Sequence, residues 1–101
     1  MNSPQDKQQE IYKAQQEILA YLNAKGDNRA VSSELISNIK CQAEIFSEST
    51  RLLNAQGFIK GPEFSGEMIT EGGNNSFRDS TQLTGSGQEK YIAIIRAEQS
   101  G

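Results

Sequence analysis

Two glycine-marked helix boundaries constrain the fold of this 101-residue chain more than any other feature. Residues 51–56 have the apolar spacing of an amphipathic helix, and Gly57 stands where helices commonly end in a left-handed residue. Residues 83–87, Leu-Thr-Gly-Ser-Gly, indicate a strand that passes into a new helix capped by Thr84. Strands are expected at about 64–70 and from Phe77 to Leu83, and the Gly- and Asn-rich stretch 71–76 between these strands predicts a tight turn. A helix, an antiparallel hairpin and a second helix are therefore expected in that order.

Helical periodicity predicts two further helices upstream and the full extent of the helix that ends at Gly57. A long helix is expected from Lys7 to Lys25, with its apolar stripe at Ile11, Ala14, Ile18 and Leu22. A short helix capped by Ser32 or Ser33 carries Leu35, Ile36 and Ile39. A third helix over about 42–56 places Phe46, Thr50 and Leu53 on its inner face. The sequence also allows a short additional strand near Ala30-Val31.

The predicted order α-α-α-β-β-α gives one α+β domain over residues 7–98, behind a disordered tail at 1–6. Its motifs Ser32-Ser33-Glu34-Leu35-Ile36 and Leu83-Thr84-x-x-Gly87-x-x-x-Tyr91 resemble those of winged helix-turn-helix proteins. The pattern Phe46-x-x-Ser49-x-x-x-Leu53-x-x-x-Gly57-Phe58-Ile59 is similar to the YjcQ-type small proteins of Gram-positive bacteria and their phages. The resemblance implies a winged helix with a two- or three-stranded antiparallel wing and a bacterial or phage origin. It implies no particular biochemistry.

Residue types that carry most enzyme chemistry are scarce. The chain has no His and one Cys, Cys41, so a histidine general base and the usual transition-metal site are excluded. We therefore expect no enzyme activity, no catalytic residues, no metal and no cofactor. A single cysteine permits no internal disulfide, and no apolar run approaches the roughly 20 residues of a membrane span, so a cytoplasmic protein is expected. Cys41 is interpreted as a small buried hydrophobe, or alternatively as an exposed thiol with a lowered pKa at a helix N-terminus.

The third helix is the candidate DNA-reading element, because that helix enters the major groove in DNA-binding winged helices. Ser47, Arg51 and Asn54 lie on its outer side at helical spacing, where Arg can bind guanine and Asn can bind adenine. The alternative is that these side chains form an ordinary solvated helix face. The predicted DNA-binding residues are Lys40, Ser47, Arg51, Asn54, Lys60 and Arg78.

Charge argues against strong DNA binding. The chain has a formal net charge of −3, and helix 42–56 has one cation, Arg51, against Glu44 and Glu48. Affinity for DNA depends on cationic side chains that displace counterions from phosphates. The predicted function is a DNA-binding transcriptional regulator or phage accessory protein, and the alternative is an acidic, non-catalytic protein–protein interaction module that binds no DNA.

The first and last helices carry more apolar surface than a small core requires. This surplus predicts a homodimer, since terminal helices commonly pair across a two-fold axis. The predicted interface residues are Tyr12, Leu19, Tyr91, Ile92 and Ile95. The alternative is that the two helices pack on each other within one protomer.

Overall fold

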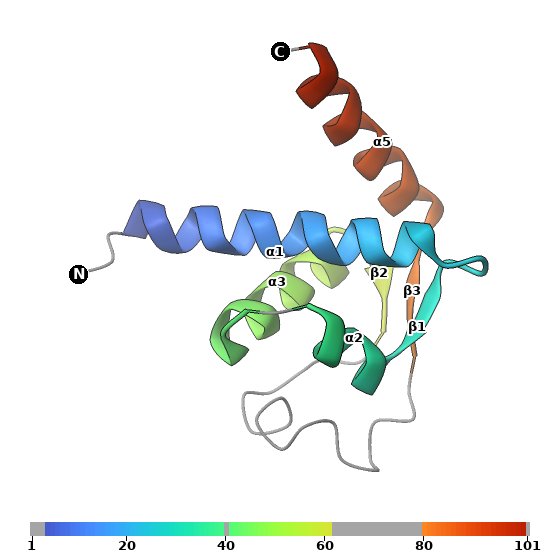
Figure 1. The fold of residues 1–101 in the computed structure, drawn as a ribbon, viewed down its shortest axis with the longest axis horizontal. Coiled ribbons are helices and arrows are strands. Elements are labelled where there is room, and N and C mark those ends of the chain that lie inside the picture. The colour runs from blue at the N-terminus through green and yellow to red at the C-terminus, as the bar shows by residue number, and fades with distance from the viewer. Residues whose placement is uncertain (1–3, 40, 62–79, 101) are drawn as a thin grey trace.

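The computed structural model describes residues 4–39, 41–61 and 80–100, which form a mixed α+β fold (Figure 1). The described elements are four helices and three short strands in the order α1 (Pro4–Ala24), β1 (Arg29–Val31), α2 (Ser32–Asn38), α3 (Ala43–Ala55), β2 (Ile59–Lys60), β3 (Ser80–Leu83) and α5 (Gly85–Ser100). This confirms the α+β class, and the arrangement is compatible with a winged helix. The strand expected at 64–70 and the first part of the strand expected from Phe77 lie outside the described residues.

The three strands form one antiparallel sheet in the order β1-β3-β2. Side chains alternate between its two faces, as the pleat requires. Ala30, Ile59, Thr81 and Leu83 are buried on the face toward the helices. The opposite face is solvent-exposed at Arg29, Val31, Lys60 and Gln82. The short strand near Ala30-Val31 is thus confirmed, and it supplies one edge of the sheet.

The core lies where α1, α3 and the inner face of the sheet meet. Phe46, Thr50 and Leu53 are at most 2% exposed, which confirms the predicted inner face of α3. Two buried hydroxyls on α3 are satisfied by the carbonyls one turn earlier: Ser49 Oγ donates to Ile45 O at 2.6 Å and Thr50 Oγ1 to Phe46 O at 3.0 Å. Polar side chains therefore enter the core without an unmet hydrogen bond on this helix.

The end of α3 and the start of α5 are joined by hydrogen bonds. Gly57 has φ +79°, the left-handed conformation expected after a helix. Thr84 Oγ1 accepts a bond from Gly87 N at 3.0 Å, which confirms Thr84 as the helix cap, and donates to Gly57 O at 2.6 Å. Gly87 packs so closely that a Cβ there would lie 2.0 Å from Phe58 O. These contacts fix where α5 leaves the sheet.

Two predicted helix starts differ from the structure. The N-cap position of α2 is Val31, with no side-chain cap bond, rather than Ser32 or Ser33. The reason is that β1 continues directly into α2, so the last strand residue occupies the capping position. Helix α1 begins at Pro4, a residue type favoured in the first helical turn, and so takes in part of the expected tail.

An ionic cluster links the end of α1 to α2. The Tyr21 hydroxyl donates to Glu34 Oε2, and Lys25 Nζ lies 2.6 Å from the same oxygen. Hydrogen bonds from Lys25 and then Tyr21 lower the pKa of Glu34, while the bond to Glu34 raises the pKa of both donors. The carboxylate is therefore stabilised in its charged form.

Candidate nucleic-acid interface

The outer side of α3 carries the predicted base-contacting residues. Arg51 is exposed, while Ser47 and Asn54 are half-buried. They lie about 100° around the helix from the buried face of Phe46, Thr50 and Leu53, and so flank that face, which is why Ser47 and Asn54 are only half-exposed. The structure thus brings Ser47, Arg51 and Asn54 to one helix, with the Arg51 side chain furthest into solvent.

Carboxylates partner the cations around α3. The Arg51 guanidinium binds both carboxylate oxygens of Glu48, with Nε 3.1 Å from Oε2 and Nη2 on Oε1. This contact lowers the pKa of Glu48. At the start of the helix, Lys7 Nζ lies 2.6 Å from Glu44 Oε1, which raises the pKa of Lys7. A phosphate or a base approaching Arg51 therefore has to compete with a carboxylate already in place.

Asn54 joins α3 to the end of β2. Its Nδ2 donates to Thr50 O at 3.2 Å, and its Oδ1 accepts from Gly61 N at 3.2 Å. Both ends of the amide are engaged within the protein, and the second bond places Lys60 beside the last turn of α3. Asn54 thus has a structural contact that the sequence pattern alone did not indicate.

A polar row crosses the outer face of the sheet. The strand register sets Arg29 opposite Gln82 and Gln82 opposite Lys60, one residue from each strand. Arg29 Nη2 donates to Gln82 Oε1 at 3.3 Å. All three side chains are exposed, and neither Arg29 nor Lys60 forms an ion pair with another described residue. Lys60 was among the predicted DNA-binding residues, but this row was not predicted, because pairing between residues so distant in sequence is not visible in a local pattern.

Two of the predicted DNA-binding residues, Lys40 and Arg78, lie outside the described residues. The described part of the predicted set comprises Ser47, Arg51, Asn54 and Lys60, gathered around α3 and the adjoining strand. No group of His, Cys, Asp and Glu suited to a metal ion occurs within the described ranges.

The predicted dimer residues divide into buried and exposed positions. Leu19 is 1% exposed and belongs to the core, so its assignment to an intermolecular interface was wrong. The wide apolar stripe of α1 is buried within the protomer, because α1 packs against α3, β3 and α5. Tyr12 and Ile92 are 51% and 45% exposed, and Tyr91 and Ile95 are half-buried.

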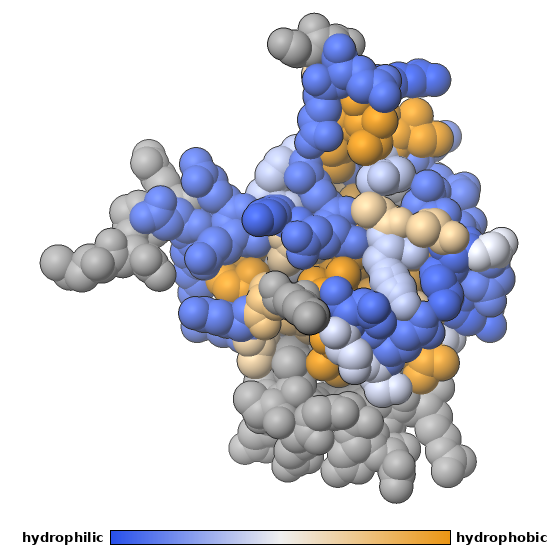
Figure 2. Space-filling view, viewed as in Figure 1, coloured by the Kyte–Doolittle hydropathy of each residue, from blue (hydrophilic) through white to orange (hydrophobic). Residues whose placement is uncertain are grey.

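The first and last helices meet within the protomer, as the alternative interpretation proposed. Tyr91, Ile94 and Ile95 of α5 line an open groove of about 260 Å³ against Lys13, Gln16, Glu17 and Ala20 of α1. Beyond this contact, α5 projects away from the body of the protein with its C-terminal end free of the other helices (Figure 1). Figure 2 shows apolar side chains gathered on the projecting helix.

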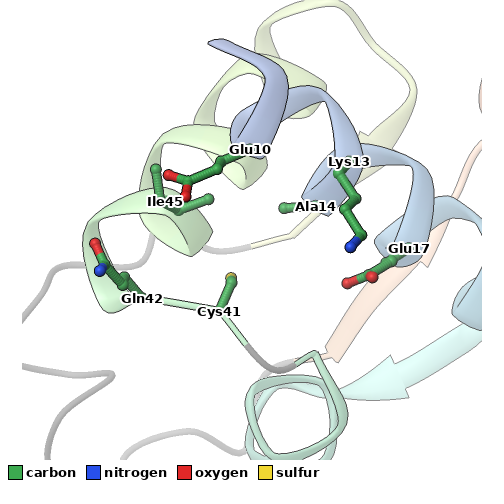
Figure 3. Close-up of a pocket in the computed structure, with 7 residues that line it drawn as sticks. All are labelled: Glu10, Lys13, Ala14, Glu17, Cys41, Gln42 and Ile45. Carbon is green, nitrogen blue, oxygen red and sulfur yellow. The ribbon is translucent and has the colours of Figure 1, made fainter. Parts of the chain in front are cut away.

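Cys41 lines a cavity of about 260 Å³ between α1 and the start of α3, shown in Figure 3. The cysteine is exposed, so neither sequence interpretation holds: it is not a buried hydrophobe, and its pKa is raised rather than lowered. Partial desolvation of the thiol raises the pKa first, followed by the charges of Glu17 and Glu10. Cys41 precedes the N-cap residue Gln42, so the dipole of α3 contributes little there.

In the described part of the chain, no helix is both long and apolar enough to span a membrane. No protein-family model matches the chain, and comparisons with curated proteins and with solved structures gave no match.

Proposed function

We propose that this chain is a winged helix-turn-helix domain that binds double-stranded DNA, as a bacterial or phage transcription regulator or DNA-binding accessory protein. The element order and the antiparallel sheet order β1-β3-β2 support the fold assignment. In such a domain α3 is the recognition helix, and the strands after it lie beside the duplex backbone.

One observation carries the proposal. The Asn54–Gly61 hydrogen bond places the end of β2 against the last turn of α3, and the strand register then continues the surface from Lys60 to Gln82 and Arg29. Cationic and amide side chains in such a row suit phosphate oxygens, since Lys and Arg neutralise phosphates and amides bond to them. In this proposal Ser47 and Arg51 face base edges, and the row binds the backbone.

The Arg51–Glu48 pair limits the affinity. If Lys60 and Arg29 neutralise about two phosphates per protomer, the slope of log affinity against log salt is about −2. Binding is expected to be weak and confined to low ionic strength. Any additional contact by Lys40 or Arg78 steepens the slope.

The test is fluorescence anisotropy of a labelled random duplex, titrated with protein over a series of salt concentrations. Lys60→Glu is expected to weaken binding at least about tenfold, because it replaces a phosphate contact with a repulsive charge. Lys13→Glu is the matched control, since it makes the same charge change on α1, away from the sheet, and leaves affinity within about threefold. Glu48→Gln is expected to tighten binding by releasing Arg51. Equal effects of Lys60→Glu and Lys13→Glu, or no binding at low salt, refute the proposal.

The second candidate is an acidic protein-interaction module. The specific observation that favours it is the ion pairing at α3, where Lys7 binds Glu44 and Arg51 binds Glu48, so both cations already have carboxylate partners within the protein. In this case the same titration shows no anisotropy change at the lowest salt, and Glu48→Gln creates no DNA binding.

A further inference from the structure

One side of α5 carries a self-complementary pattern of charge and apolar surface. Glu89, Ile92 and Arg96 are all exposed, and their spacing of three and four residues aligns them along the helix. Ile95 is half-buried and borders the same side. Gly87 and Ile94 lie on the opposite side of the helix, where they face Phe58 and the core. An apolar centre therefore lies between an acid at one end and a base at the other.

This pattern suits an antiparallel copy of the same helix. Glu89 and Arg96 are seven residues, about 10.5 Å, apart along the axis. A two-fold axis midway between them sets Glu89 of each protomer opposite Arg96 of the other. The same axis passes close to Ile92, so it brings Ile92 of each copy against Ile92 of the other, and Ile95 lies one turn further out beside this contact. A parallel pair would instead place Glu89 against Glu89 and Arg96 against Arg96.

We propose that a second copy of this chain docks antiparallel on the α5 face formed by Glu89, Ile92, Ile95 and Arg96. The resulting dimer is isologous, with two Glu89–Arg96 pairs on either side of the isoleucine contacts. The occupant is a second copy rather than another protein because the charges on this one face complement their own two-fold image. The projection of α5 from the body leaves room for it (Figure 1). This dimer is independent of DNA binding.

The interface is small. Helix α5 has 16 residues, which corresponds to a length of about 24 Å, so a single helix pair buries less than the roughly 1,200 Å² of a standard stable interface. We therefore expect a weak dimer, with a dissociation constant of about 10 to 500 µM. Of the interface residues predicted from sequence, this dimer uses Ile92 and Ile95, while Tyr91 packs against its own protomer.

The first experiment is sedimentation equilibrium of the full chain over about 5 µM to 1 mM, a range that brackets the expected dissociation constant. The wild type is expected to approach the dimer mass at the upper end. Ile92→Lys is expected to remain monomeric, because it places two buried ammonium groups near each other. Ala97→Lys is the matched control: it introduces the same residue at an exposed position about 140° around the helix and leaves dimerisation unchanged. A wild type that stays monomeric throughout overturns the proposal, as does equal weakening by both variants.

The second experiment exchanges the charges. Glu89→Arg and Arg96→Glu each create two like-charge contacts per dimer and are expected to weaken dimerisation about 10- to 30-fold. The double variant Glu89→Arg/Arg96→Glu restores both pairs and is expected to dimerise within about threefold of the wild type. Far-UV circular dichroism establishes that each variant is folded. Failure of the double variant to recover, in a folded protein, rules out the antiparallel register.

Discussion

The same chemical change is expected to have opposite effects at two threonines of this protein. Thr81 and Thr84 lie three residues apart, on β3 and at the start of α5, and replacing either by Val removes one hydroxyl at nearly constant volume. Thr84 Oγ1 has two partners, Gly87 N and Gly57 O. Thr81 Oγ1 is fully buried and has no hydrogen-bond partner among the described residues.

The magnitudes follow from those contacts. Thr84→Val removes a helix cap worth about 1 kcal/mol and a further hydrogen bond worth about 1 kcal/mol, so it is expected to lower the free energy of unfolding by about 2 kcal/mol. Thr81→Val removes the desolvation penalty of an unpaired hydroxyl and is expected to raise the free energy of unfolding by about 1 kcal/mol. Val also suits a strand. The two variants should therefore differ by about 3 kcal/mol.

The assay is urea unfolding followed by far-UV circular dichroism, with tyrosine fluorescence as a second probe because the chain has no Trp. At a slope of about 1 kcal/mol per molar urea, the midpoints of the two variants differ by about 3 M. Thr84→Ser is the control, since it retains the hydroxyl and should stay within about 0.5 kcal/mol of the wild type. Destabilisation of similar size at both positions would refute the assignment of an unpaired hydroxyl at Thr81.

Three further outcomes are expected. Gly87→Ala places a Cβ against Phe58 O and should destabilise the protein by about 2 to 4 kcal/mol. At Gly85 an added Cβ meets nothing within 4 Å, so Gly85→Ala should change stability by less than about 1 kcal/mol. The urea midpoints of the two variants measure both effects. The pKa of Glu34 is lowered from its ordinary value of 4.5 in the folded protein. Its contribution to the free energy of unfolding is therefore present at neutral pH and is lost as the pH falls through this lowered pKa. Glu34→Gln should therefore reduce the drop in urea midpoint between neutral and acidic pH, and an unchanged acid profile would contradict this. Since the pKa of Cys41 is raised, a disulfide reagent should label it more slowly at mildly alkaline pH than an unperturbed thiol, and Glu17→Gln should speed the reaction; faster labelling of the wild type would disprove the assignment.

Local patterns predicted those parts of the fold that local chemistry determines. The spacing of Phe46, Thr50 and Leu53 is a property of one helix, and these side chains are buried as expected. Gly57 and Thr84 were predicted correctly because a left-handed residue and a helix cap each depend on a few neighbouring backbone groups.

Features that depend on packing between distant segments were not predictable in the same way. Leu19 was assigned to a dimer because one helix does not reveal how many elements surround it, and α1 has three major neighbours. The Arg29–Gln82–Lys60 row depends on strand register. The environment of Cys41 depends on Glu10 and Glu17, which come from a different helix. The charge pairs on α3 were visible as residue types, but the Lys7–Glu44 contact joins separate helices.

The bonding of Thr84 and Gly87 to residues 57–58 has a mechanical consequence. The residue that caps α5 is hydrogen-bonded to the short backbone segment that follows α3: Thr84 N donates to Phe58 O at 3.1 Å, and Thr84 Oγ1 donates to Gly57 O. Helix α5 therefore cannot swing without displacing the C-terminal end of α3. A molecule that shifts one of these helices upon binding must alter the energy of moving the other, and thermodynamic linkage makes that influence equal in both directions.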